Sequence, residues 1–236
     1  MRFVLIACAA LVLSTLAPIH AAAITPEESK LQAEFNKAYR VPDKDLRKNA
    51  LVMLDGAKHS STWQLLAGVA SSDPEADVRL AAFTVLAKEP ARDGTHAHML
   101  VSLYSALKPN ELETRASYAQ AMAPSQFKAE IVATLVDNLS RLRHPKIPQL
   151  MQTSNGQTNA MAIKTAEKSC KEFDDLLAGL NAVYKTEVLA ATYESPLQIG
   201  KWYQATAAKI VAADKELLEK YKKEDAEAAK AAKAAK

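Results

Sequence analysis

Apolar residues recur at intervals of three and four positions along most of the chain, and no segment shows a sustained alternation of period two. Spacings of three and four are typical of amphipathic helices, whereas half-buried strands alternate at every second residue. A capping residue stands directly before proline at Thr25, Asp73 and Ser195, which is a pattern that marks helix starts. The pattern therefore predicts an all-α protein.

Short polar or proline-containing stretches interrupt this periodicity in the first part of the chain. They lie at 41–43, 58–61, 71–74, 89–94, 108–110 and 123–125. The segments between them predict helices of about 10 to 15 residues, and loops this short favour antiparallel packing of successive helices. Residues 24–142 are thus predicted to form an array of helical pairs.

An internal repeat is visible when three of these predicted helices are aligned on arginine. Arg47, Arg79 and Arg115 are 32 and then 36 positions apart, and each is followed by a large apolar residue seven positions later. The third position after the arginine is alanine in the first two segments and Tyr118 in the third. A period of this length corresponds to one pair of helices, which buries its apolar faces only by stacking on its neighbours.

The segment DPEADVRLAAFTVLAKEP, residues 73–90, resembles the first part of a HEAT-type repeat, in which an acidic residue, an apolar residue and arginine precede alanine. The resemblance covers residues 43–143, with units shorter than usual; the tryptophan, glycine, tyrosine and proline pattern of tetratricopeptide repeats is missing. It implies a short right-handed solenoid whose concave face binds other macromolecules, without catalysis of its own. It also implies that the repeated arginines are mostly structural and pair with acidic groups such as Asp45 and Asp77. The alternative is that they contact a ligand.

A different pattern begins after residue 142. Residues 143–159 carry prolines, a glycine and a polar cluster, which predicts a linker. Beyond it, a heptad stripe predicts a long amphipathic helix that extends through Val188 and Ala191. The stripe consists of Ile163, Ala166, Cys170, Phe173, Leu177, Leu180 and Tyr184.

A second long helix is predicted from Ser195, and the two are expected to form an antiparallel hairpin over residues 160–221. Its apolar stripe consists of Trp202 or Tyr203, Ile210, Leu217 and Tyr221. Trp202 and Tyr203 are interpreted as packing residues, because aromatic side chains in the first turn of a packing helix are usually buried. The alternative is a recognition surface.

Residues 222–236 contain only alanine and charged side chains after Tyr221. Alanine favours helix but leaves nothing large to bury, so this tail is predicted to be either a solvated continuation of the helix or disordered. Lys230, Lys233 and Lys236 lie along one side of such a helix. They are interpreted as solubilising, with a weak contact to an anionic envelope polymer or lipid surface as the alternative.

The N-terminal residues 1–23 have the pattern of a signal peptide. Arg2 precedes an apolar run from Phe3 to Leu16, and small residues at 21–23 fit cleavage after Ala23. The run is shorter than the roughly 20 residues that span a bilayer, and it continues beyond Cys8, which disfavours a lipidated cysteine at that position. The protein is therefore predicted to be secreted or periplasmic, without a transmembrane span.

Composition excludes several classes of function. Cleavage leaves Cys170 as the single cysteine, so no internal disulfide is expected, and its place in the heptad stripe predicts a core residue. The alternative is a reactive or intermolecular thiol. The net charge falls from +3 to +2 when Arg2 is removed, which is too small to predict nucleic acid as a partner. The six glycines are too far apart to build a phosphate-binding loop.

Candidate chemistry is sparse. His96 and His98 would share a face only on a strand, whereas on a helix they point about 200° apart, so no metal site is predicted. The chain contains no H-E-x-x-H, C-x-x-C or G-x-S-x-G motif, and we predict no catalytic residue and no cofactor. The leading prediction is a non-enzymatic scaffold that binds a protein partner. The alternatives are a cell-envelope structural or assembly factor that uses the hairpin and tail, and an unrecognised enzyme or accessory subunit.

Overall fold

The computed structural model describes residues 24–88, 94–108, 111–142, 160–186 and 194–234. Within these ranges every regular element is a helix, which confirms the all-α prediction. The elements are α1 (Pro26–Tyr39), α2 (Lys44–Leu51), the short 3₁₀ helix η1 (Val52–Leu54), α3 (Ser60–Ser72), α4 (Ala76–Lys88), α5 (Thr95–Ser105), α6 (Leu112–Ala121), α7 (Ala129–Arg141), α9 (Ala160–Val183) and α10 (Ser195–Ala234). The predicted signal peptide, 1–23, and linker, 143–159, lie outside the described residues.

The first helices begin at polar caps that satisfy their free amide groups. The Thr25 hydroxyl accepts a hydrogen bond from the Glu28 amide at the start of α1, as its sequence predicts. The carboxylate of Asp43 accepts from the amides of Asp45 and Leu46 at the start of α2. These caps fix where each helix starts and therefore which of its faces point inward.

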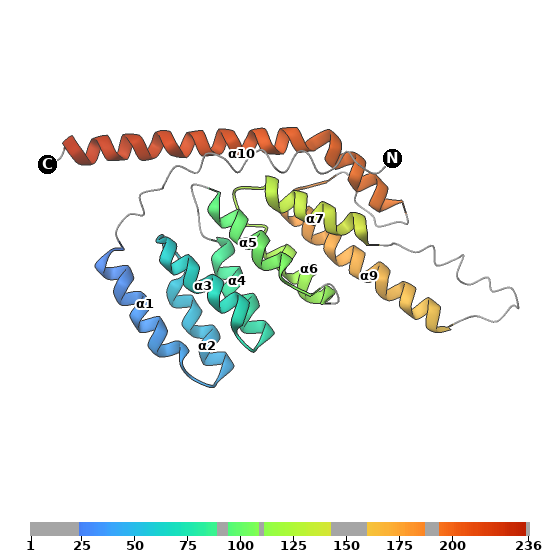
Figure 1. Ribbon diagram of the computed structural model, residues 1–236, viewed down its shortest axis with the longest axis horizontal. Helices are drawn as coiled ribbons and strands as arrows, with labels where there is room; N and C mark the ends of the chain where they lie inside the picture. Colours follow the sequence, from blue (N-terminus) through green and yellow to red (C-terminus); the bar gives the residue numbers. More distant parts are fainter. Residues whose placement is uncertain (1–23, 89–93, 109–110, 143–159, 187–193, 235–236) are drawn as a thin grey trace, which may run out of the picture.

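The helices are arranged in two rows (Figure 1). In one row α2, α4, α6 and α9 each pack on the next; in the other, α3, α5, α7 and α10 do so. Contacts of α4 with α3 and α5, and of α7 with α9, join the rows, and α1 packs on α2. The rows advance in the same direction as far as α7 and α9, whereas α10 runs lengthwise from the α9 side of the molecule toward the side of α1 (Figure 1).

A continuous hydrophobic core fills the space between the rows, and it extends from Phe35 in α1 to Ile210 in α10. It therefore runs through both regions that the sequence divides at residue 142. The third and seventh positions after each repeated arginine are buried in all three units, as the repeat predicts. These residues are Ala50, Leu54, Ala82, Leu86, Tyr118 and Met122.

Helix α9 follows its predicted stripe but ends earlier than expected. Phe173, Leu177 and Leu180 are buried. The helix ends at Val183, and Val188 and Ala191, to which the prediction extended it, lie outside the described residues. The Asn181 side chain accepts hydrogen bonds from both the amide and the hydroxyl of Thr186, which turns the chain away from the helix axis.

The antiparallel hairpin of the two long helices is not confirmed. Helix α9 packs on α6 and α7, while α10 packs on α7. The rings of Tyr184 and Trp202 lie 5.9 Å apart and form a contact between the two helices near the connection. An apolar stripe predicts that a helix face is buried but not which helix buries it, and here the rows supply the partner.

Helix α10 continues to Ala234, so the tail is a helix rather than a disordered segment over the residues described. Trp202 and Tyr203 are half-buried and pack on the core, as predicted. Between residues 222 and 231 every side chain except the half-buried Glu224 is exposed. None of the described helices is both long and apolar enough to cross a membrane.

Candidate functional site

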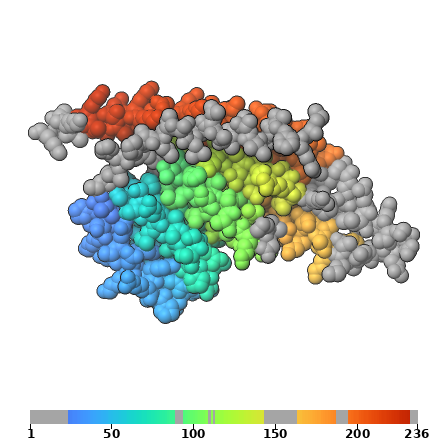
Figure 2. Space-filling view, in the orientation of Figure 1, coloured from blue at the N-terminus to red at the C-terminus, as the bar shows by residue number. Residues whose placement is uncertain are grey.

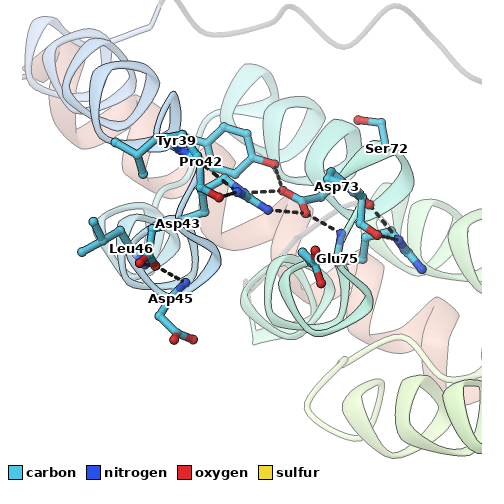
Figure 3. A network of polar contacts seen from close by, with 12 residues as sticks. Tyr39, Pro42, Asp43, Asp45, Leu46, Ser72, Asp73 and Glu75 are labelled. Atoms are coloured by element: carbon cyan, nitrogen blue, oxygen red, sulfur yellow. Dashed lines mark hydrogen bonds and ion pairs between the residues drawn. The ribbon is translucent and has the colours of Figure 1, made fainter.

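The repeated arginine of the first unit, Arg47, lies in a buried polar network. Figure 3 shows this network around Tyr39, Pro42 and Asp73. Arg47 donates from Nε and Nη2 to the two carboxylate oxygens of Asp73, at 3.0 and 3.2 Å. Its Nη1 donates to the carbonyls of Pro42, at 2.6 Å, and Val41, at 3.3 Å. Arg47 is 8% exposed and Asp73 3% exposed, so the two charges are paired away from bulk water.

Asp73 is the centre of this network. The Tyr39 hydroxyl donates to one carboxylate oxygen, and the Glu75 amide donates to the other at 2.9 Å. Burial alone would raise the pKa of Asp73, but the hydrogen bonds from Arg47, Tyr39 and the Glu75 amide outweigh burial and lower it. Burial and the bond to Asp73 raise the pKa of Tyr39 to about 12. The carboxylate is therefore ionised and the phenol neutral at neutral pH.

The second unit repeats part of this arrangement. Arg79 donates from Nη1 to the carbonyls of Asp73, at 2.7 Å, and Pro74, at 3.1 Å. These carbonyls stand six and five positions before Arg79, as those of Val41 and Pro42 stand before Arg47. We call this contact of an arginine with the two carbonyls of the preceding loop the arginine clamp.

The third arginine makes other contacts. Arg115 donates from Nη1 to the side-chain oxygen of Asn138 at 3.1 Å, and its guanidinium lies 5.2 Å from the centre of the Tyr104 ring. Pro109 stands six positions before Arg115 instead of five, and it lies outside the described residues. The structure thus shows the arginine clamp in the first two units.

The acidic partners that the sequence suggests for the arginines are wrong. Arg47 pairs with Asp73 and not with Asp45, and Asp77 lies 3.5 Å from Lys44 and 4.0 Å from Lys48 instead of pairing with Arg79. Side chains two positions apart on a helix point in different directions. Asp45 and Asp77 therefore face away from the arginines that follow them.

The two candidate histidines lie in different environments on α5. His96 is buried, with its ring 4.0 Å from that of Trp63, whereas His98 is exposed and its Nδ1 lies 2.8 Å from Glu130. The structure therefore does not bring them together. Among the described residues, no three His, Cys, Asp or Glu side chains are grouped in a way that could hold a metal ion.

Cys170 is half-buried on α9. Burial raises the pKa of its thiol, and the nearby carboxylates of Asp174 and Glu167 raise it further. The thiol is therefore protonated at neutral pH, which lowers its reactivity. Because Cys170 is only half-buried and is not among the residues that form or border the hydrophobic core, its predicted core position is not confirmed.

A polar contact that the sequence does not reveal joins α10 to α7. The carboxylate of Asp214 accepts hydrogen bonds from the backbone amides of Lys128, at 3.0 Å, and Ala129, at 2.8 Å. Lys128 stands at the N-cap of α7 without a side-chain cap of its own. Asp214 thus supplies the missing cap, and the ring of Tyr221 lies 6.4 Å from that of Phe127 further along the same contact.

Replacing Asp214 by alanine is expected to lower the free energy of unfolding by about 1 kcal/mol, the usual cost of a lost helix cap. It should also speed proteolysis of α10, because the helix loses its polar contact with α7. Glu216→Ala, an exposed position on the same helix, is the matched control and should leave both measurements unchanged. Equal losses from the two variants in chemical denaturation would contradict the capping role.

The exposed large apolar side chains of the described residues mark two surfaces. Leu46, 55% exposed, and Val52, 66% exposed, lie on α2 and η1; Leu197 and Val211 lie on α10. Helices α1 and α2 form one end of the molecule (Figure 2). Single exposed apolar side chains are common on protein surfaces, and they add apolar contact area where a partner covers them.

These contacts define a structural network and a helical surface. Comparison with protein-family models, with curated proteins and with solved structures finds no match to the chain. The exposed apolar side chains of Leu46 and Val52 make the surface of the helical rows at the α2 end the candidate functional site.

Proposed function

We propose that the protein is an exported, HEAT-like scaffold that binds a protein partner on the surface of its helical rows. The arginine clamp carries this proposal, because Arg47 and Arg79 make the same two carbonyl contacts at equivalent positions of successive units. Recurring contacts of this kind give the first two units the same local geometry, as is expected of a solenoid. Export rests on the N-terminal pattern of residues 1–23.

Binding would occur by shape and surface chemistry on rigid helices rather than by a conformational change. The buried pair of Arg47 and Asp73 ties the loop before α2 to the loop before α4, so it fixes one unit on the next. A surface held in this way loses little conformational entropy when a partner docks. The exposed Leu46 and Val52 supply apolar contact area on that surface.

A second candidate function is favoured by α10. This helix is 40 residues long, and its last described turns are exposed, with Lys230 among their side chains. A cell-envelope assembly factor could use such an arm to contact an anionic polymer or lipid surface while the rows only position it.

Affinity capture from the native envelope fraction, followed by mass spectrometry, separates the two functions. The mature chain and a chain that ends at Tyr221 are expected to capture the same protein partner in equal amounts, because the rows are intact in both. Loss of capture on removing 222–236 would favour the assembly factor. Absence of any captured protein with the full mature chain would contradict the scaffold.

A further inference from the structure

The contact between α2 and α4 shows which faces two successive helices of the row use to pack on each other. Asp77 of α4 lies 3.5 Å from Lys44 and 4.0 Å from Lys48 of α2, and Lys88 of α4 lies 3.6 Å from Asp55. Asp77 and Lys88 are three helical turns apart, so they lie on one face of α4. This face is the one that α4 presents to α2.

Helix α2 carries an equivalent face, and it is exposed. Aligning the first two units on Arg47 and Arg79 pairs Asp45 with Asp77, Asn49 with Ala81, and Val52 with Thr84. We call Asp45, Asn49 and Val52 the outer α2 face; all three are exposed. Leu46 lies beside them and is 55% exposed. The row therefore begins with a stacking face that none of the described helices covers.

We propose that the outer α2 face binds a basic helix of a protein partner, which packs on α2 as α2 packs on α4. The proposal rests on the scaffold function and names the partner's chemistry. On α4, Asp77, which is equivalent to Asp45, is paired with two lysines four residues apart on α2, Lys44 and Lys48. Because Asp45 is equivalent to Asp77, it would pair with two cationic side chains, lysine or arginine, on the partner's helix.

Charge and apolar contact favour this occupant together. Asp45 carries the only charge of the outer α2 face, whereas Lys44 and Lys48 of α2 are directed toward Asp77 on the other side. A single exposed ion pair contributes little affinity, so the apolar side chains of Val52 and Leu46 must supply the rest. A helix with two cations beside apolar residues satisfies both requirements, whereas an acidic helix would meet Asp45 with like charge.

The test uses the full mature chain and two synthetic helical peptides of about 18 residues, long enough to be helical in isolation. One carries two lysines four residues apart beside two leucines; the other has glutamates in place of the lysines. In an NMR titration of the ¹⁵N-labelled chain, the lysine peptide is expected to shift the amide signals of Asp45, Asn49 and Val52. The glutamate peptide is expected to bind about tenfold more weakly or worse.

Reversing the charge makes the test independent of misfolding. Asp45→Lys should reverse the preference, so that the glutamate peptide binds more tightly than the lysine peptide; an unfolded variant cannot produce this gain. Asn49→Ala, on the same face but uncharged, is the matched control and should keep the original preference. Equal binding of both peptides, or shifts confined to other surfaces, would overturn the proposal.

Two further results separate this proposal from the scaffold function. If Leu46→Ser with Val52→Ser leaves capture of the native partner intact, and neither peptide binds the unsubstituted mature chain, the scaffold stands and the basic-helix site is wrong. If sedimentation shows a dimer that Val52→Glu dissociates, a second copy occupies the face and the proposal is overturned. Loss of native capture in the double variant, with an unchanged melting temperature, supports it.

Discussion

Replacing Asp73 by alanine is expected to lower the free energy of unfolding by about 3 kcal/mol. The substitution leaves the buried guanidinium of Arg47 without its counter-charge and removes the acceptor of the Tyr39 hydroxyl. Breaking a buried ion pair costs far more than the pair contributes when intact, because one charge then stays buried without a partner. Urea denaturation at neutral pH measures the loss.

The matched control is Asp77→Ala, which removes an acidic residue from an ion pair that is about half exposed. Exposed pairs contribute little, so this variant is expected to stay close to the wild type. A loss as small for Asp73→Ala as for Asp77→Ala would contradict the central place of Asp73 in the network.

The same carboxylate makes stability depend on pH. Because its pKa in the folded chain is lowered below the unfolded value of about 3.9, Asp73 stabilises the fold fully above that value. The contribution is lost as the pH falls through the folded pKa. The difference in stability between wild type and Asp73→Ala should therefore shrink as denaturation is repeated below about pH 4. A difference that grows on acidification would contradict the lowered pKa.

Gly179→Ala is expected to destabilise the protein by about 1–3 kcal/mol, although alanine is the better helix former. A Cβ atom at this position would lie 2.6 Å from the Cβ of Ala119 and 3.4 Å from the backbone nitrogen of Gln120. Helices α6 and α9 pack closely here, and the overlap can be relieved only by moving them apart. Thermal and chemical denaturation would measure the loss.

Gly68→Ala is the control, and we expect it to change the stability in the opposite direction. Gly68 lies within α3, and a Cβ atom added there meets nothing within 4 Å. This variant is therefore expected to stabilise the fold by about 0.5–1 kcal/mol through helix propensity alone. Stabilisation by both substitutions would show that α9 does not pack on α6 at the distance described.

Local patterns in the sequence predict the features that depend on near neighbours. The cap at Thr25 and the buried positions Ala82 and Leu86 follow from spacing within one helix, and the structure confirms them. The arginine repeat likewise marks the residues that form the clamp. Each of these signals lies within a few turns of chain, where geometry depends on local sequence.

The features that the sequence does not reveal depend on which elements meet in space. The partner of Arg47 is 26 positions away in another loop, so the nearby Asp45 is the wrong choice. The position of α9 on α6 depends on the close approach at Gly179, and an isolated glycine in a helix gives no indication of what it contacts. The outer α2 face can be recognised only from the structure, because it is equivalent to the face of α4 that packs on α2.

The cap that Asp214 places on α7 affects the order in which the protein matures. Proteins are synthesised from the N-terminus, and Lys128, the first residue to be capped, precedes Asp214 by 86 positions. While the nascent chain grows, α7 is complete before the group that closes its end has been made. A truncated product that stops before residue 214 therefore keeps an open helix end, where fraying begins and where quality-control proteases gain access.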